Sequence, residues 1–300
     1  MKDPENMSNQ NKNDTCVFTV LYPGMEKWID EFADSLSKQD FPDFDLVMIN
    51  DGLDLEQLKG IGQKFNCKIL TPSGSIAGNR NKGFSYIVKN GYRFVIFSDS
   101  DDLMGKNRIS LCRELLKDYD IIVNDLTVIN SKGKTITAHY LSRRLKDRQS
   151  IRLEDILDHN IIGLGNSSVK AEVLNGIVIP DELKVVDWYL FTKLLSRGCK
   201  AVFTSSASTL YRQHESNILG FHRPDTHNIR SLIQQKYRHY YHLQNLSSHH
   251  KKRFAEYDQL IQNIKDPVFL ESYLKQIREE LPDFPFWFES VKPHLKMNQL

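Results

Sequence analysis

The stretch that decides the fold is GNRNKGFSYIVKNGYRFVIFSDSDD, residues 78–102. Its first half predicts a helix, and the apolar run RFVIF at 93–97 predicts a buried strand. That strand ends directly in Asp99, Asp101 and Asp102. Ligands of open α/β sheets bind where the carboxyl ends of the strands meet the connecting loops. The stretch therefore predicts an α/β domain with an acidic site at the end of this strand.

Helices and strands alternate along the first 130 residues, with short connections between them. Asn50 and Asp51 end the second strand, so they should lie at the same sheet edge as the acidic cluster. The alternation is typical of a Rossmann-like, mostly parallel sheet with helices on both faces. We predict strands at 15–22, 43–52, 67–70 and 93–97, and helices at 26–39, 55–65 and 79–91.

The second half of the chain is less regular, and its composition changes after residue 218. Residues 225–300 gain Gln, His, Lys and Tyr and show helical periodicity, which predicts a separate helical C-terminal region at 219–300. The first residues, 1–14, have the composition of a disordered tail. Between these ends we predict strands at 120–130, 133–141 and 200–206, and helices at 150–160 and 187–198.

Composition excludes several classes of protein. Lys plus Arg number 40 against 38 for Asp plus Glu, which gives no overall field to attract nucleic acid. No apolar run approaches the ~18 residues of a membrane helix, and the N-terminus lacks the apolar segment of a signal peptide. The four cysteines show no CxxC pair and are expected to be reduced. We therefore expect a cytoplasmic protein that binds anions only locally.

The acidic cluster is the first candidate for chemistry. Asp99, Asp101 and Asp102 place up to three negative charges together, and each raises the pKa of the others. A divalent cation offsets such charge, and Mg²⁺ or Mn²⁺ commonly bridges carboxylates to a diphosphate. The alternative is a solvated acidic turn that caps the next helix. A calcium loop of the EF-hand type is disfavoured, since the run lacks the required Gly and Glu.

Two further groups carry candidate binding residues. The carboxylate of Asp51 can accept a hydrogen bond from N3 of uracil or from a ribose hydroxyl, although an Asn-Asp-Gly sequence is more often a turn. Arg80 and Lys82 lie near the start of the predicted helix, where phosphates bind favourably. A solvated basic helix face explains these two residues equally well.

Taken together, these stretches resemble a known family. The segments are FADSLSKQDFPDFDLVMINDG (32–52), the stretch at 78–102, VVDWYLFTKLLSRG (185–198) and YRQHESN (211–217). They occur in the order and at the rough spacing of the large inverting glycosyltransferase family usually numbered two, which has the GT-A fold. The resemblance covers roughly residues 15 to 218. It implies a nucleotide-binding half at about 15–130 and an acceptor half at about 131–218.

The resemblance implies a donor site with defined residues. Asp51 matches the acidic residue that faces the nucleobase, usually uracil, and Arg80 matches a basic residue near the base and the phosphates. Asp99 and Asp101 match the DxD pair, the first near the ribose and the second on the metal. Asp102 completes the family's DSDD and would also face the metal. The donor implied is a nucleotide sugar, in particular a UDP-sugar, and the cofactor is Mn²⁺ or Mg²⁺.

The catalytic and C-terminal positions follow from the same resemblance. Asp187 matches the carboxylate that acts as general base on the acceptor hydroxyl. His214 matches a position that reaches the metal or the diphosphate, and Arg212 beside it would contact the nucleotide sugar. The chain departs from the family at Asn50, where an acidic residue is usual, and at Val186, where Glu is usual. The QxxRW block of processive synthases is absent, which favours transfer of single sugars.

Two other functions stay open from the sequence. A sugar nucleotidyltransferase could use the same sheet and acidic site, although VLYPGMEKW (20–28) offers little of its Gly-rich, basic signature. A catalytically inactive member could hold a nucleotide sugar or a glycan without turnover. A product assay with UDP-, GDP- and dTDP-sugars separates these functions from a transferase.

The sequence does not identify the acceptor. A glycan or a lipid-linked acceptor of surface polysaccharide or glycoconjugate synthesis is expected from the resemblance. The segment KYRHYYHLQNLSSHHKKRF (236–254) is basic and aromatic. It would suit either peripheral contact with the inner face of the membrane or a homodimer helix.

Overall fold

A ten-stranded mixed sheet forms the centre of the computed structural model, which describes residues 13–214 and 224–293. The strand order is β3-β2-β1-β4-β9-β6-β10-β5, with β7 beside β6 and β8 beside β10. The strands are β1 (Thr15–Leu21), β2 (Asp45–Asn50), β3 (Cys67–Leu70), β4 (Phe94–Phe97), β5 (Leu103–Met104), β6 (Ile121–Asn130), β7 (Thr135–Thr137), β8 (Ser150–Ile151), β9 (Ser167–Lys170) and β10 (Ala201–Gln213).

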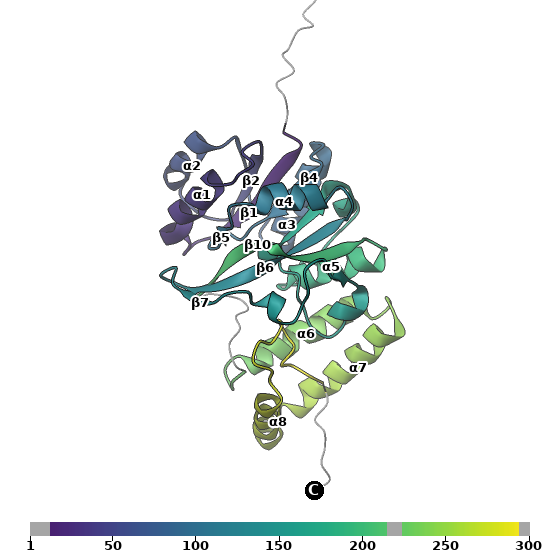
Figure 1. Ribbon diagram of the computed structural model, residues 1–300. Coiled ribbons are helices and arrows are strands. Elements are labelled where there is room, and N and C mark those ends of the chain that lie inside the picture. Colours follow the sequence, from purple (N-terminus) through teal and green to yellow (C-terminus); the bar gives the residue numbers. More distant parts are fainter. Residues whose placement is uncertain (1–12, 215–223, 294–300) are drawn as a thin grey trace, which may run out of the picture.

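Helices cover both faces of this sheet, and three more gather at one end of the molecule (Figure 1). The α-helices are α1 (Ile29–Ser37), α2 (Lys59–Lys64), α3 (Ile76–Lys89), α4 (Arg108–Leu115), α5 (Val186–Ser196), α6 (Ile229–Leu243), α7 (Ser248–Asn263) and α8 (Pro267–Glu279). Short 3₁₀ turns are η1 (Glu26–Trp28), η2 (Leu55–Leu58), η3 (Leu141–Arg143), η4 (Leu153–Ile156), η5 (Leu164–Asn166) and η6 (Ala171–Leu174).

The sheet is parallel over β1 to β4, the strands of the predicted nucleotide-binding half, as predicted. β1 pairs in parallel with β2 and with β4, and β2 pairs in parallel with β3. β6 and β10 are also parallel to each other. β9 is antiparallel to both of its neighbours, β4 and β6. The predicted α/β class with a mostly parallel sheet flanked by helices is confirmed.

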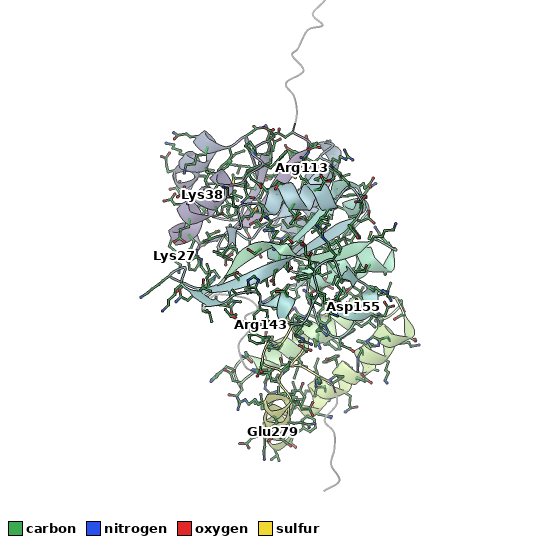
Figure 2. All side chains as sticks on the ribbon, viewed as in Figure 1. Lys27, Lys38, Arg113, Arg143, Asp155 and Glu279 are labelled. Carbon is green, nitrogen blue, oxygen red and sulfur yellow. The ribbon has the colours of Figure 1, made fainter. Side chains whose placement is uncertain are left out.

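Alternation along β1 divides the core between the two faces of the sheet. Val17 and Leu21 belong to the apolar cluster that contains Phe32 of α1, whereas Phe18 belongs to the cluster that contains Phe84 of α3. Successive strand residues point to opposite faces, so a strand with both faces covered must be apolar throughout. This explains why TCVFTVL is buried along its whole length. The charged side chains of Lys38 and Glu279 are exposed (Figure 2).

Three predicted elements of the second half differ in the structure. The strand predicted at 133–141 is confined to β7 (Thr135–Thr137), and Leu141 begins the 3₁₀ turn η3. The helix predicted at 150–160 is instead the short strand β8 followed by the 3₁₀ turn η4. The strand predicted at 200–206 continues to Gln213, because an irregularity between Thr204 and Ser208 lets β10 resume its pairing with β6. The longer strand brings the residues that follow Ser208 to the acidic cluster.

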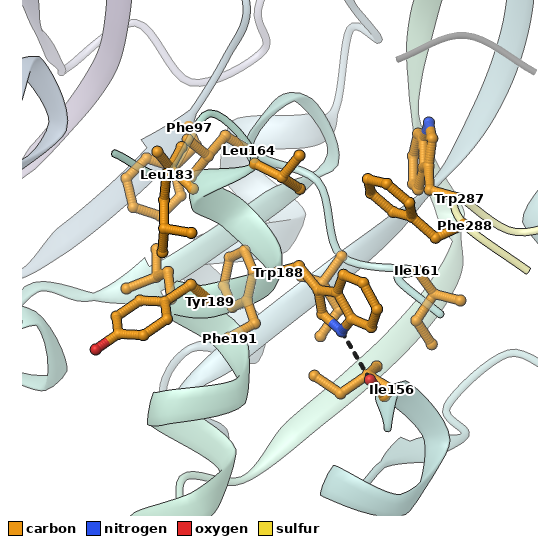
Figure 3. Close-up of a cluster of buried hydrophobic side chains, with 14 of the residues drawn as sticks. Phe97, Ile156, Ile161, Leu164, Leu183, Trp188, Tyr189, Phe191, Trp287 and Phe288 are labelled. Carbon is orange, nitrogen blue, oxygen red and sulfur yellow. Dashed lines mark hydrogen bonds between the residues drawn. The ribbon is translucent and has the colours of Figure 1, made fainter. Parts of the chain in front are cut away.

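The C-terminal helices are present, and they share a core with the sheet. Tyr240 of α6 and Tyr257 of α7 are fully buried in the same apolar cluster as Trp188 of α5. Figure 3 shows part of this cluster, in which the Trp188 indole Nε1 donates a hydrogen bond of 2.7 Å to the carbonyl oxygen of Ile156. In the described part of the chain no helix is long and apolar enough to cross a membrane. Membrane or dimer contact through 236–254 stays a prediction.

Some of the predicted boundaries fall outside the described residues. Residues 1–12 of the predicted tail, residues 215–223 around the predicted start of the C-terminal region, and residues 294–300 lie there. Within the described part, the Asn13 side chain donates to Asp45 at 2.8 Å, and Asp14 forms an ion pair with Arg113 at 2.8 Å.

Candidate active site

A pocket of about 490 Å³ opens beside the carboxyl ends of β1, β2 and β4. Its walls include Asp51, Arg80, Asp99, Asp101 and Asp187. These residues come from the ends of β2 and β4 and from the first turns of α3 and α5. The structure therefore brings together five of the residues singled out in the sequence, as the rule for parallel sheets predicts.

Asp101 and His214 form a close pair at this pocket. His214 Nε2 lies 2.8 Å from Asp101 Oδ2, and both side chains are nearly buried, at 7% and 6% exposed. The Tyr22 hydroxyl donates to the same carboxylate oxygen at 2.9 Å. The His214 ring lies against Trp28, with ring centroids 4.5 Å apart. A carboxylate oxygen and an imidazole nitrogen are thus held side by side at the end of β10.

Asp102 and Arg212 lie close to this pair but do not line the pocket. The Arg212 backbone N–H donates to Asp102 Oδ1 at 2.7 Å. The side-chain Nε of Arg212 donates to the carbonyl oxygen of Asp101 at 2.7 Å. The fully buried guanidinium also donates to Glu31 at 2.7 Å. Burial, together with the charges of Asp101 and Asp99, raises the pKa of Asp102 well above its ordinary value. These contacts hold the acidic loop in shape, and the roles implied by the resemblance, Asp102 at the metal and Arg212 at the nucleotide sugar, stay predictions.

Asp99 sits between Arg80 and Gly165. Arg80 lies 3.6 Å from Asp99 Oδ1. A Cβ on Gly165 would lie 2.8 Å from Asp99 Oδ2 and 2.9 Å from Asp102 Oδ2, so the loop before β9 approaches both carboxylates as closely as a glycine permits. Burial raises the pKa of Asp99 to about 6, and Arg80 opposes this rise. Burial likewise lowers the pKa of Arg80, while Asp99 and Asp187 oppose that shift.

Asp187 enters the pocket from the first turn of α5. Its Oδ1 accepts a hydrogen bond of 2.8 Å from the backbone N–H of Trp188. Burial raises the pKa of Asp187 to about 7; the negative charge of Asp99 adds to this, while the Trp188 hydrogen bond and Arg80 oppose it. A carboxyl group with a pKa near neutrality can both lose and accept a proton at physiological pH. The position has the electrostatics expected of a general base.

Asp51 occupies the end of β2 at the edge of the same pocket. The Asn79 side-chain amide donates to Asp51 Oδ2 at 2.9 Å and fixes the orientation of the carboxylate. Asn79 is buried in the first turn of α3, whose N-cap Ser75 accepts a hydrogen bond from the Gly78 N–H. Asp51 therefore has one oxygen held by the protein, in a carboxylate that faces the pocket.

Sequence reasoning missed several residues of the pocket. Tyr22 directly follows β1, so the strand-end rule that selected Asp51 could have found it. Asn79 lies inside α3, where that rule does not apply. Gly165 lies in the stretch IIGLGNSSV (161–169), whose glycines alone do not indicate a contact with the acidic cluster. Trp287 lines the pocket although it lies about a hundred residues beyond Asp187 along the chain, and no sequence pattern pointed to it.

The donor set allows a metal but does not form a complete cage. Among residues 13–214 and 224–293, no three His, Cys, Asp or Glu side chains gather as a ready-made metal site. The pair of Asp101 and His214 offers one oxygen and one nitrogen. Mg²⁺ and Mn²⁺ often take few protein ligands and complete their shells with phosphate oxygens and water. The pair therefore fits a cation that binds together with a substrate phosphate.

Known proteins share this sequence pattern. The family model described as "Glycosyl transferase family 2" matches residues 16–169. The dTDP-rhamnosyl transferase RfbG of Shigella flexneri is 24% identical over 215 residues, which cover 65% of this chain and 71% of that protein. The poly(ribitol-phosphate) β-N-acetylglucosaminyltransferase TarS of Staphylococcus aureus is 27% identical over 188 residues. That match covers 58% of this chain but only 31% of TarS.

Solved structures share the fold. The crystal structure of S. aureus TarS 1–349 in complex with UDP-GlcNAc has a TM-score of 0.60 at 19% identity, covering 81% of this chain and 71% of that chain. The mannosyltransferase PcManGT of Pyrobaculum calidifontis, in complex with GDP-Man and Mn²⁺, has a TM-score of 0.51 at 13% identity, covering 77% of this chain and 64% of that one. The GT-A type of fold expected from the sequence is confirmed. The chain belongs to glycosyl transferase family 2 and is a glycosyltransferase.

Proposed function

We propose that the chain is a metal-dependent inverting enzyme that moves one sugar from a UDP-sugar to a hydroxyl group of a glycan or lipid-linked acceptor. The observation that carries this proposal is one pocket lined by Asp51, Asp101 and Asp187. Each of these carboxyl groups would perform a different task in the reaction. Asp51 would recognise the nucleobase, Asp101 would bind a cation, and Asp187 would remove a proton from the acceptor.

The charge of the pocket supports the need for a cation. Four carboxyl side chains line it against two basic ones, Arg80 and Lys184. A nucleoside diphosphate adds more negative charge, so repulsion opposes its entry unless a divalent cation accompanies it. Asp101 and His214 would hold that cation, with Tyr22 and Arg212 fixing the Asp101 carboxylate and its backbone. The cation would supply Lewis-acid stabilisation of the departing diphosphate.

Asp187 would act as the general base. Its carboxylate takes the proton of the acceptor hydroxyl while the hydroxyl oxygen bonds to the anomeric carbon. The bond between that carbon and the β-phosphate oxygen breaks, and the nucleoside diphosphate leaves. Attack from the side opposite the leaving group inverts the configuration at the anomeric carbon. A pKa of about 7 suits this role, because the base must be ionised before the step and protonated after it.

Asp51 would recognise the base of the donor. One oxygen is already held by Asn79, which leaves the carboxylate able to accept from N3–H of a pyrimidine. Uracil and thymine share this imide edge, and guanine presents a different pattern of donors and acceptors. TarS was crystallised with UDP-GlcNAc, whereas RfbG is named for a dTDP-sugar. UDP is the expected nucleotide, and dTDP is the informative competitor.

One assay tests the three parts of this proposal. The purified chain is incubated with UDP-, dTDP- and GDP-sugars in Mn²⁺ and in EDTA, and the anomeric configuration of the product is read by NMR. We expect transfer from UDP-sugars, inversion, and loss of activity in EDTA. Undiminished turnover in EDTA would refute the metal role, and a product of retained configuration would refute the role of Asp187. Preference for GDP-sugars would refute the role of Asp51.

A further inference from the structure

The segment 284–292, which follows α8, reaches back to the pocket. It carries Phe286, Trp287 and Phe288 in a row, and Trp287 is one of the pocket-lining residues. The segment lies far beyond residues 16–169, which the family model matches. The pocket is therefore completed by a part of the chain that the family model does not describe.

Side chains from α6, α7 and α8 and from the residues that flank η3 hold this segment in place. Arg144 pairs with Glu289, and Lys236 donates to the carbonyl oxygen of Val291 at 2.6 Å from a buried position in α6. Other hydrogen bonds to its carbonyl oxygens come from Tyr140 to Pro285 at 2.9 Å, Tyr257 to Val291 at 2.7 Å and Tyr273 to Lys292 at 2.8 Å. These hydrogen bonds to the carbonyl oxygens of Pro285, Val291 and Lys292 fix the path of the backbone on both sides of Trp287.

The backbone conformation at Phe288 directs the rings of Trp287 and Phe288 to different neighbours. Phe288 has φ of 64°, a left-handed conformation that is costly for a bulky residue and persists where its surroundings enforce it. Its ring stacks on Trp188, with centroids 5.2 Å apart (Figure 3). The Asn160 N–H donates to the Trp287 carbonyl oxygen at 2.9 Å. Phe288 thus packs into the core. Trp287 is also buried, at 8% exposed, and the part of its ring that stays accessible lines the pocket.

Trp287 lies beside Asp187. A Cβ on Gly163 would be 3.6 Å from Cη2 of Trp287 and 3.7 Å from Oδ2 of Asp187, so both groups border the same small space. The Tyr211 ring meets Trp287 edge-on, with centroids 5.8 Å apart, and also lines the pocket. The nearest side-chain atom to that Cβ would be Asn166 Oδ1, at 3.1 Å. The ring edge of Trp287 and the proposed base therefore adjoin each other.

We propose that Trp287 determines acceptor specificity: the part of its indole that lines the pocket beside Asp187 contacts the apolar face of an acceptor pyranose ring. This inference rests on the proposed role of Asp187. A base must stand next to the hydroxyl that it deprotonates, so the surface adjoining Asp187 belongs to the acceptor. The residues expected to hold the nucleotide, Asp51 and Asn79, lie instead at the ends of β2 and the start of α3. The acceptor class is a cyclic sugar rather than an open-chain polyol, which has no flat apolar face.

The test compares variants of the full chain loaded with UDP and Mn²⁺. Trp287→Leu removes the aromatic face, and Trp287→Phe keeps a smaller one. Phe286→Leu is the matched control, because Phe286 is a buried ring of the same segment that stacks on His159 and does not line the pocket. Methyl α- and β-D-glycopyranosides serve as probes against ribitol, and their binding is followed by saturation-transfer NMR, which does not depend on turnover. Melting temperatures verify that each variant is folded.

We expect pyranoside signals in the wild type that fall in Trp287→Leu and persist in Phe286→Leu. The acceptor KM should rise about five- to tenfold in Trp287→Leu and about twofold in Trp287→Phe. Hydrolysis of the UDP-sugar without acceptor should stay within about twofold of the wild type in the control Phe286→Leu, since Phe286 does not line the pocket. Binding of ribitol in preference to the pyranosides would overturn the inference, as would an acceptor KM in Trp287→Leu equal to that of the control. Absence of any donor cleavage in the wild type would instead count against the proposed function.

Discussion

Replacing Asp187 by Asn would test the base and its environment at the same time. The amide keeps the size of the carboxyl group and can still accept the Trp188 N–H, but it cannot take a proton from the acceptor. A general base contributes about 10²- to 10⁴-fold to the rate, so kcat should fall by that factor. UDP affinity should change little, because the nucleotide contacts are expected at Asp51 and Asp101.

The same substitution should stabilise the folded chain at alkaline pH. Burial raises the pKa of Asp187 from 3.8 to about 7, so the folded chain binds more protons than the unfolded chain between these values. The free energy of unfolding therefore falls as pH rises through this window, and above pH 7 the wild type bears the full cost of the ionised group. About three pKa units correspond to roughly 4 kcal/mol as an upper bound, which Asn removes. At pH 5 the gain should be much smaller.

The measurements are kcat, UDP affinity by calorimetry, and melting temperature between pH 5 and pH 8.5. Wild-type kcat should decline about tenfold per pH unit below pH 7, as the base becomes protonated. The Asn variant should lack this dependence and should melt higher than the wild type at pH 8.5. Nearly normal turnover in the variant, or a wild-type rate independent of pH between 5 and 8, would refute the assignment. A lower melting temperature at pH 8.5 would refute the account of its burial.

Three further substitutions address other parts of the pocket. Asp101→Ala should abolish Mn²⁺-dependent UDP binding, measured by calorimetry, while the chain still melts cooperatively; unchanged Mn²⁺ dependence would contradict the metal role. Asp51→Asn should weaken UDP binding by about tenfold, as expected for loss of one charge-assisted hydrogen bond, and an equal effect on GDP would remove its role in base selection. Gly165→Ala should destabilise the chain by about 1–3 kcal/mol and impair donor binding, because the added Cβ would lie 2.8 Å from Asp99 Oδ2. The control is Gly62→Ala, where an added Cβ meets nothing within 4 Å. Equal melting temperatures of the two variants would contradict the close approach of Gly165 to Asp99.

The nucleotide side of the fold could be predicted because local pattern and tertiary position agree there. β1, β2 and β4 are buried on both faces and therefore read as continuous apolar runs. Asp51 and Asp99 follow the ends of these strands, and their positions alone locate the ligand-binding edge of the sheet, without an alignment of related sequences. The strand-end rule needs only the order of elements, and this order was clear in the first 130 residues.

The other half resisted prediction because long-range contacts decide its structure. Residues 150–160 have a helical pattern, yet the carbonyl oxygens of Ile156, Leu157 and Asp158 accept hydrogen bonds from α5 and α6 side chains. These tertiary bonds override local helix propensity. The site of Trp287 depends on the same kind of contact, since side chains spread from Tyr140 to Tyr273 hold its segment. No periodicity within the segment carries that information.

The reversed direction of β9 has a consequence for how this enzyme can diversify. In a parallel strand the residues at the site come after the strand, but in β9 they come before it, at Gly163 and Gly165. The loop at 161–166 is therefore anchored to the sheet downstream by β9, which pairs with β4, the strand that leads to Asp99. Exchanging residues 161–164 while keeping Gly165 would remodel the wall beside Asp187 without disturbing the close approach to Asp99. Substrate range can then evolve, or be engineered, one loop at a time.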